Sequence, residues 1–433
     1  MPAPIPFTEY RARVKSLLEK MGPDTAAILY AAPSAYRSRD TEYAYRQDSD
    51  FYYLTGFNES HAVLVLLPQT ETPVVLFNQT RKAEEEIWSG ARIGQEAAVK
   101  EYGVDAAFAI DEIATRMPKL LAQKKIIYYP INQVRDQDLE VLKWINQMQT
   151  ATRGATPDLM PLSKLTAPMR LIKSPAEIEL MRHAATLSAQ AHNIAMEKVH
   201  AGQFEYQLAA EYLYHYNVND ARDVAYLPIV AGGKNACVLH YTANTDVLRD
   251  GDLVLVDAGC EYQNYCADVS RTFPVNGRFT PEQAEIYQLV LDAYRAGLKQ
   301  IHPGSTMIKV QNAAIEVLTQ GLVELKLLQG KVSDLIAHTA YKKFFMHGVG
   351  HWLGLDVHDV GAYKINNEPV TFKAGMVLTL EPGIYISESV EIDKKWWHIG
   401  VRIEDDILVT PKGHEVLSSA APISLEDIEQ LMR

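Results

Sequence analysis

Short apolar runs alternate with amphipathic segments over the first 150 residues of the chain. Alternation of strands and helices is typical of an α/β domain, and here it predicts a mixed sheet. The apolar runs predict strands at 26–32, 51–54, 62–68, 74–77 and 126–129, and helices are predicted at 80–88 and 111–123.

The second half of the chain has longer helical segments. SPAE at 174–177 and TPEQ at 280–283 each place a hydroxyl residue before a proline and an acid or amide, which is the capping-box signature of a helix start. Helices are predicted at 176–199, 204–217, 281–299 and 306–326, and strands at 253–257, 267–273, 376–381 and 401–409. This half is therefore predicted to be α+β.

A proline-rich stretch separates the two halves. Pro157, Pro161, Pro168 and Pro175 fall within 20 residues, which is typical of a linker that ends at a helix start. We place the boundary near residue 172, so that the predicted domains are 1–172 and 173–433.

Composition and charge narrow the classes of partner. The net charge of −12 excludes a basic footprint for nucleic acid and disfavours an anionic membrane surface. Three cysteines give no disulfide framework and fit a reducing compartment. The first 20 residues contain no apolar leader, and no apolar stretch approaches the ~18 residues of a membrane span. A cytoplasmic protein is therefore expected.

Two acids follow closely on an apolar run. LVLVDAG at 253–259 delivers Asp257 into a turn of small residues, and Asp268 follows eleven residues later. A buried carboxylate is costly unless it is paired or bound to a metal. Taken alone, the segment around Asp268 is better explained by an edge strand with a polar outer face.

Three further segments carry histidines or acids. HGVGHWLGLDVHD at 347–359 interleaves three histidines with glycines, and MVLTLEPG at 376–383 ends an apolar run at Glu381. Thr379 shares the strand face of Glu381 and is expected to orient it. GVRIEDDI at 400–407 carries Arg402 and Glu404 on one face, although by itself it is typical of a strand with a solvated charged face.

Together these segments predict a metal-dependent hydrolase. Four carboxylates that lie close together repel one another unless cations are present. A set of mostly oxygen ligands with one imidazole suits Mn²⁺, Co²⁺ or Fe²⁺ better than a thiolate site does. Two cations about 3.5–4 Å apart would compensate the charge and activate water. The predicted ligands are Asp257, Asp268, His351, Glu381 and Glu404.

The order Asp, Asp, His, Glu, Glu resembles the pita-bread metallopeptidases, and in particular the aminopeptidase P family. The resemblance rests on LVDAGCEYQNYCADVSRTFPVNG, HGVGHWLGLDVHDVG, LTLEPGIYI and GVRIEDDILVT, and it spans residues 173–433. In the first half, YRQDSDFYYLTGF at 45–57 and EEEIWSGARIG at 84–94 resemble bacterial members. The implied fold is an α/β N-terminal domain with a mixed sheet followed by an α+β pita-bread (creatinase/aminopeptidase-like) catalytic domain.

The resemblance implies a dinuclear site, usually of manganese, with Co²⁺, Fe²⁺ or Zn²⁺ as alternatives. Asp257 would chelate one metal, Asp268 and Glu404 would bridge both, and His351 and Glu381 would complete the other shell. Glu381 would also be the general base that takes the proton of the water between the metals.

The resemblance also implies roles for residues around the ligands. His358 would donate to the substrate carbonyl or the developing oxyanion, and His240 and His347 match active-site histidines. Arg402 and Tyr385 would shape the proline side of the cleft. Trp88 and Arg153 match positions that approach the substrate, Trp88 from a neighbouring subunit. A homo-oligomer, either dimer or tetramer, is therefore implied, with the N-terminal domain serving oligomerisation and substrate access.

The implied activity is release of the N-terminal residue from peptides with proline second. An X-Pro bond lacks an N–H on its leaving nitrogen, which sets such substrates apart from those of ordinary proteases. The alternative is a prolidase, which shares the fold and ligands but cuts X-Pro dipeptides. A methionine aminopeptidase lacks the large N-terminal domain. A non-catalytic binding module and a creatinase-like enzyme without metal are both disfavoured by the complete ligand set. The segment 387–399 fits the family pattern poorly, and its role stays open.

Overall fold

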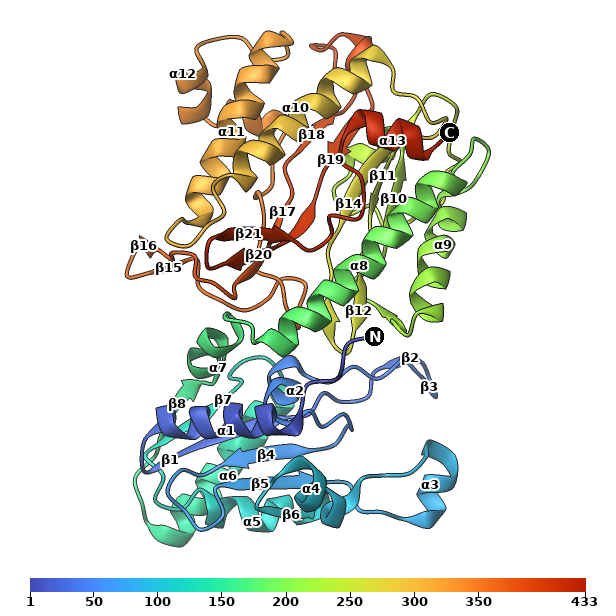
Figure 1. The fold of residues 1–433 in the computed structure, drawn as a ribbon. Coiled ribbons are helices and arrows are strands. Elements are labelled where there is room, and N and C mark those ends of the chain that lie inside the picture. The colour runs from blue at the N-terminus through green and yellow to red at the C-terminus, as the bar shows by residue number, and fades with distance from the viewer. The chain divides into compact units, whose positions relative to one another are not determined.

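The computed structural model describes residues 1–433, apart from the side chain of Thr152. The chain divides into two compact units (Figure 1). One comprises residues 5–170, and the other comprises residues 171–433 together with residues 1–4. Each unit is described by itself.

A six-stranded sheet forms the centre of the N-terminal unit. Its order is β6-β5-β4-β1-β7-β8, with β4 antiparallel to β1 and β5, and parallel pairs at both edges. The prediction of a mixed sheet is confirmed. The strands are β1 (Thr25–Tyr30), β4 (Val63–Leu66), β5 (Val74–Asn78), β6 (Ala106–Ala109), β7 (Ile126–Tyr129) and β8 (Asp158–Pro161), and β2 (Tyr36–Ser38) and β3 (Thr41–Glu42) form a separate hairpin.

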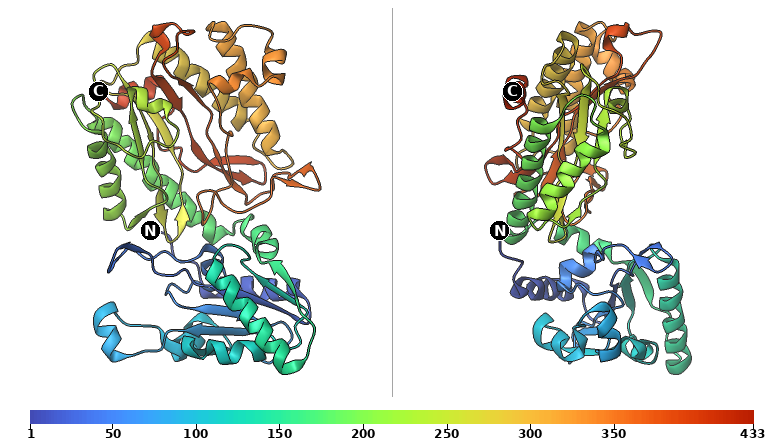
Figure 2. Two further views of the ribbon diagram at one scale, coloured as in Figure 1. Left: turned by 180° about the vertical axis from the view of Figure 1, so that it is seen from behind. Right: turned by 90° about the vertical axis from the view of Figure 1, so that its right-hand side faces the viewer.

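Helices cover both faces of this sheet. α6 (Arg135–Thr152) turns Val141, Trp144, Ile145 and Met148 toward one face, because residues spaced three and four apart share one side of a helix. α1 lies on the opposite face (Figure 2). The remaining helices are α1 (Phe7–Met21), α2 (Ser49–Thr55), α3 (Ala83–Ser89), α4 (Gly94–Tyr102), η1 (Ile110–Glu112), α5 (Ile113–Leu120) and α7 (Ser163–Arg170).

The strand predicted at 51–54 is wrong, because this segment is helix α2. Asp48 accepts a hydrogen bond from the Phe51 N–H at 2.8 Å and so caps the helix N-terminus. Gly56 ends the helix in the left-handed region with φ of 63°. Two local caps therefore override the aromatic, strand-like composition of residues 51–54, which lie between them.

Two small sheets meet in the C-terminal unit. One is β10 (Ile229–Gly232), β11 (Leu253–Asp257) and β14 (Ser270–Pro274); the other is β17 (Val377–Leu380), β20 (Asp405–Thr410) and β21 (Gly413–Val416). A single bridge between Ser270 and Glu404 joins them. The other strands are the pair β18 (Gly383–Ile386) and β19 (Ile399–Arg402), with β9 (Asp223–Val224), β12 (Cys260–Tyr262), β13 (Tyr265–Cys266), β15 (Lys364–Ile365) and β16 (Glu368–Pro369).

Long helices pack in pairs around these sheets. α8 (Pro175–Lys198) contacts α9 (Glu205–Val218), and α10 (Pro281–Leu298) contacts α11 (Met307–Glu324) (Figure 1). Both predicted capping boxes are confirmed, at Ser174 and at Thr280. Shorter elements are η2 (Gly233–Cys237), α12 (Val332–Ala337), η3 (Ala340–Lys343), η4 (Lys394–Trp396) and α13 (Leu425–Leu431). Within the described residues, no helix is both long and apolar enough to cross a membrane.

Two predicted strands differ from the structure near the acids. The strand predicted at 401–409 is β19 and β20 with a break at 403–404, because β19 pairs with β18 whereas β20 pairs with β17. The strand predicted at 267–273 begins only at Ser270. The Asp268 N–H instead donates to the carboxylate of Asp406 at 3.2 Å. Both irregular positions carry a predicted metal ligand.

Candidate metal centre

Asp257 and Asp268 lie side by side at the end of β11. Gly259 allows the two segments to approach, since a Cβ there would lie 1.8 Å from the Ala267 carbonyl oxygen. The hydroxyl of Tyr226 contacts Asp257 Oδ1 at 2.5 Å and Asp268 Oδ1 at 2.6 Å. A hydroxyl has one hydrogen to donate, so it cannot satisfy both carboxylates.

His351 lies on a segment that runs alongside β17. The Thr379 N–H donates to the His351 carbonyl at 2.8 Å, and the His351 N–H donates to Thr379 Oγ1 at 3.1 Å. Gly350 permits this approach, because a Cβ there would lie 2.0 Å from the Thr379 carbonyl oxygen. Gly350 therefore serves close backbone packing between the histidine segment and β17.

Glu381 follows directly after β17 on the same face as Thr379. Thr379 Oγ1 lies 3.4 Å from Glu381 Oε1, the contact that the strand periodicity predicts. The Glu381 N–H donates to the Val349 carbonyl at 2.8 Å, which fixes the residue beside the histidine segment.

Glu404 occupies the break between β19 and β20. Its Oε2 accepts a hydrogen bond from Ser270 Oγ at 2.7 Å. Arg402 donates from Nε to Ser270 Oγ at 2.9 Å and from Nη2 to Asp257 Oδ2 at 2.6 Å. One guanidinium thus links the acids of the two sheets.

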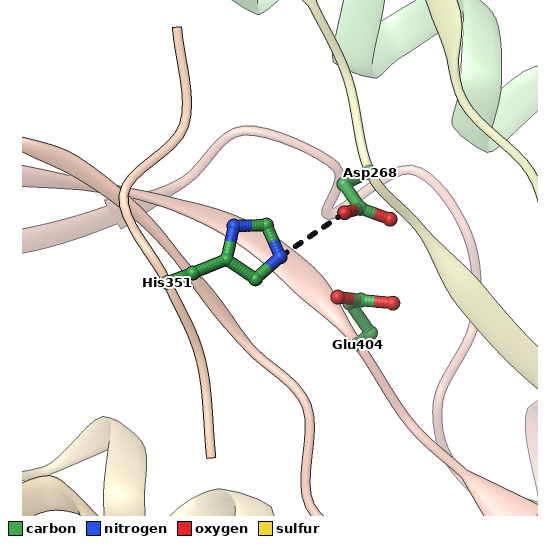
Figure 3. Close-up of side chains that lie close together, drawn as sticks. All are labelled: Asp268, His351 and Glu404. Atoms are coloured by element: carbon green, nitrogen blue, oxygen red, sulfur yellow. Dashed lines mark ion pairs between the residues drawn. The ribbon is translucent and has the colours of Figure 1, made fainter. Parts of the chain in front are cut away.

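Asp268, His351 and Glu404 each direct a ligand atom into one small volume (Figure 3). These three atoms lie within 4.8 Å of one another. Asp257 and Glu381 join them, because Tyr226 couples Asp257 to Asp268, and His351 Nε2 lies 3.6 Å from Glu381 Oε1. The structure therefore brings all five predicted ligands together.

The donor atoms fit a cation. His351 Nδ1 lies 3.0 Å from the Trp352 carbonyl oxygen, which can only accept, so Nδ1 carries the hydrogen. The Nε2 lone pair of a neutral ring then faces Asp268 Oδ2 at 3.3 Å. A lone pair opposed to a carboxylate oxygen needs a proton or a metal between them. This arrangement matches the usual support of a metal-bound histidine by a second hydrogen bond.

The pKa values of the candidate ligands show the same crowding of lone pairs and negative charge. Burial and the charge of Asp268, only partly offset by His351, raise the pKa of Glu381 to about 7. Burial disfavours the charged form of His351, but its contact with Asp268 and the charge of Glu381 prevail and raise its pKa to about 9. Burial and the neighbouring carboxylates raise the pKa of Glu404 well above its usual range. Without metal, protons must occupy this site.

A cavity of about 410 Å³ opens onto the ligands. His347 contacts Tyr385 OH through Nε2 at 2.8 Å, and burial lowers the pKa of His347 to about 4. Arg402 also donates to the Tyr385 hydroxyl at 3.0 Å. The lining residues are the five ligands with Leu239, His240, His347, Gly348, Gly350, His358, Tyr363 and Arg402. The predicted His240, His347, His358, Tyr385 and Arg402 are thus gathered at one place.

His358 lies over His351, with ring centroids 4.2 Å apart. The next residue, Asp359, accepts a hydrogen bond from Lys173 Nζ at 2.9 Å, and both side chains are 1% exposed. A buried ion pair therefore anchors the segment that carries His358 to the start of the unit.

Trp88 and Arg153 belong to the N-terminal unit, whereas the cluster belongs to the C-terminal unit. Trp88 lies on α3 and is 90% exposed. Arg153 is exposed and ends α6 with φ of 51°. Their substrate roles stay predictions.

Comparison with known proteins identifies the family. The model of metallopeptidase family M24 matches residues 179–411, which is more than half of the chain. The chain belongs to metallopeptidase family M24. The aminopeptidase P N-terminal domain matches residues 10–128 of this M24 chain. Family membership implies divalent metal ions, in agreement with the donor set.

Relatives and solved structures match along nearly the whole M24 chain. The Escherichia coli Xaa-Pro aminopeptidase is 44% identical, over 98% of this chain and 97% of its own, and human Xaa-Pro aminopeptidase 3 is 35% identical, over 97% and 84%. The structure of a Pseudomonas aeruginosa aminopeptidase matches with a TM-score of 0.97 at 47% identity, over 99% and 98% of the two chains. Escherichia coli aminopeptidase P in complex with substrate matches with a TM-score of 0.95 at 43% identity, over 99% of each chain. The predicted pita-bread fold is confirmed.

Sequence reasoning missed several residues of the site. Tyr226 and Ser270 contact the ligands directly, and Leu239 and Tyr363 line the cavity. Ser270 belongs to the edge strand predicted around Asp268, and nothing in that pattern marks it as a contact of a ligand. Tyr226 carries no motif of its own, so its position depends on tertiary packing that a single sequence does not display.

Proposed function

We propose that the chain is a dinuclear-metal aminopeptidase that releases the N-terminal residue from peptides with proline in the second position. The observation that carries this proposal is the gathering of four carboxylates and one imidazole at the floor of a cavity lined by three further histidines. The Xaa-Pro aminopeptidases that match this chain support the substrate class.

Asp257, Asp268, His351, Glu381 and Glu404 would hold two divalent cations, with Mn²⁺ expected and Co²⁺, Fe²⁺ or Zn²⁺ as alternatives. When bound, such cations activate water and polarise the scissile carbonyl. Glu381 would take the proton from the attacking water and return it to the leaving proline nitrogen. Proton transfer of this kind by a positioned carboxylate is general acid–base catalysis.

The remaining residues would bind and orient the substrate. His358, at the mouth of the ligand cluster, donates to the oxyanion that develops on the scissile carbonyl. His240 and His347 contact the peptide groups on either side of it. The Tyr385 hydroxyl is hydrogen-bonded to both His347 and Arg402. Tyr385 and Arg402 would form the wall against the proline ring.

A longer peptide fits this site better than a dipeptide. Binding the free carboxylate of an X-Pro dipeptide calls for a cation beside the proline. In the part of the chain that the structure describes, Arg402 is the one arginine that lines the cavity, and Asp257, Ser270 and Tyr385 already accept its hydrogen bonds. This favours the aminopeptidase over the prolidase.

The test is cleavage of an X-Pro dipeptide compared with an X-Pro-Y tripeptide and longer peptides, in Mn²⁺ with an EDTA control. We expect the longer peptides to be cleaved at higher kcat/KM and chelator to abolish cleavage. Cleavage of the dipeptide alone would assign a prolidase. Absence of metal-dependent cleavage of any peptide would contradict the catalytic proposal.

Assembly and compartment are part of the same proposal. A homo-oligomer, dimer or tetramer, would give the exposed Trp88 a neighbouring subunit to contact, and the domain 1–172 would serve assembly and substrate access, with Arg153 as a substrate-binding residue. Sedimentation velocity of the wild type and Trp88→Ala tests this. The odd, low cysteine count supports a cytoplasmic location.

A further inference from the structure

Glu205 is a buried carboxylate outside the metal centre that binds the segment carrying His240. It is the first residue of α9, and its side chain is fully buried. Its Oε1 accepts hydrogen bonds from the backbone N–H of Gly232 and from the side-chain amide of Asn235, both at 2.9 Å. These two donors lie where the chain leaves β10, at the start of the His240 segment (residues 233–246).

The other oxygen of Glu205 binds the far end of the same segment. Oε2 accepts from the backbone N–H of Asp246 and from the hydroxyl of Tyr241, both at 2.8 Å. Tyr241 is the immediate neighbour of His240. One carboxylate therefore closes the His240 segment into a loop and bonds to the residue beside the histidine.

Four donors demand a carboxylate at this position. A carboxylate offers about four lone-pair sites on two oxygens, which matches the four N–H and O–H groups that point at it. A glutamine amide has the same shape but one acceptor oxygen, and its NH₂ would face two donors. Buried donors without an acceptor are costly, so the loop would rearrange around an amide.

The loop in turn decides where the imidazole of His240 lies. His240 is exposed at the wall of the cavity that His347 and His358 also line. An exposed side chain takes its position from the backbone that carries it rather than from packing.

We propose that Glu205 is a positioning residue, which holds the His240 segment closed so that His240 faces the substrate above the metal centre. The inference rests on the proposed function, because that function gives His240 its substrate contact. Glu205 itself touches neither the ligands nor the cavity.

The experiment compares Glu205→Gln with wild type by kinetics, metal content and amide hydrogen exchange. We expect kcat on an X-Pro-Y peptide to fall by about tenfold or more, because small displacements of a substrate-contacting group are costly. Metal content should stay at the wild-type value, and exchange should become faster within 233–246. Unchanged kcat together with unchanged exchange would overturn the proposal.

Glu177→Gln is the matched control. Glu177 is also a buried glutamate in the first turn of a helix, and it accepts hydrogen bonds from the Ser174 N–H and the Tyr265 hydroxyl. We expect it to lower the Tm while kcat stays within about twofold of wild type. An equal loss of kcat in this control would mean that destabilisation alone explains the Glu205 variant.

A double-mutant cycle with His240→Ala separates positioning from general damage. If Glu205 acts through His240, Glu205→Gln should change kcat less than about twofold in the His240→Ala background. Retention of the full tenfold loss there would overturn the proposal. Tyr241→Phe removes the hydroxyl nearest His240, with its bonds to Glu205 and the Thr245 N–H, so it should show the same coupling to His240 even if Glu205→Gln fails to fold.

Hydrogen exchange also separates this inference from the proposed function. If wild type cleaves no X-Pro peptide, the proposed function fails. Faster exchange confined to 233–246 in Glu205→Gln or Tyr241→Phe would still support the inference that Glu205 restrains this segment. Unchanged exchange in both variants would refute that inference.

Discussion

The two ring nitrogens of His351 have different partners, and this difference decides what the site can bind. Nδ1 donates to the Trp352 carbonyl, so Nε2 presents its lone pair to the carboxylate of Asp268. The tautomer that coordinates a metal through Nε2 is therefore fixed by the backbone before any ion arrives.

Asp268→Asn tests whether that carboxylate holds metal. The amide keeps the shape but removes one negative charge from the centre of the cluster, so we expect metal content to drop and kcat to fall by about a thousandfold or more. Elemental analysis and peptide cleavage measure the two effects. Asp292→Asn, at an exposed acid on α10, is the control and should behave like wild type. Full activity in Asp268→Asn would contradict the ligand assignment.

His358→Ala separates oxyanion stabilisation from metal binding. The imidazole packs against the ring of His351 but is not one of the five predicted ligands, so both metals should be retained while kcat falls by about a hundredfold. His302→Ala, at an exposed histidine, serves as control. Loss of metal in His358→Ala would show that the residue is a ligand rather than an oxyanion donor.

Asp257 and Glu381 were predictable as candidate ligands because each ends an apolar run, where an isolated charge would be too costly, whereas Asp268 and Glu404 became candidates only when the segments were taken together. Glu205 shows the limit of that reasoning. In the sequence it is an acid at the start of a predicted helix, which ordinarily indicates a solvated first turn. Its burial depends on donors 27 to 41 residues away along the chain, and local pattern does not display such contacts.

At the scale of elements, the long helices and the strands β11 and β17 followed from the local pattern, whereas the break in the strand predicted at 401–409 did not. The break at 403–404 arises because neighbouring residues pair with different strands, β18 and β17, and that exchange is a tertiary event. Helix α2 was missed although its caps at Asp48 and Gly56 are local signals, because its aromatic run has the composition of a strand.

The pairing of the histidine segment with β17 makes Gly350 sensitive to substitution. Gly350→Ala would place a methyl 2.0 Å from the Thr379 carbonyl oxygen, so the segment must move away and carry His351 with it. We expect weaker metal binding and a lower Tm, measured by metal titration and thermal unfolding. Gly348→Ala, two residues earlier, has no heavy atom nearer than 3.9 Å and should keep both wild-type values. Equal behaviour of the two variants would show that the strand contact is unimportant.

At the scale of the whole molecule, metal binding should be coupled to proton release. In the metal-free site the pKa of Glu381 is raised to about 7 and that of His351 to about 9. Both groups must lose their protons to become ligands, so affinity should rise as the pH increases from 6 to 9. Glu404, whose pKa is also raised by burial and the neighbouring carboxylates, adds to this release, so we expect more protons to be released at pH 6 than at pH 8.

Calorimetric titration of Mn²⁺ in buffers of different ionisation enthalpy measures this release. The Asp292→Asn protein should give the wild-type proton count, because its substitution lies outside the site. A pH-independent affinity with no proton release would mean that the acids are already deprotonated before metal binds.

The single bridge between Ser270 and Glu404 has a consequence for biosynthesis. Asp257 and Asp268 emerge from the ribosome well before His351, Glu381 and Glu404. The bridge that joins the two sheets needs both Ser270 and Glu404, so it cannot form until the later sheet has been made. A nascent chain therefore has no complete donor set until residue 404 has been made. We therefore expect loading with metal to follow translation of the catalytic unit and to depend on the ions available to the finished chain.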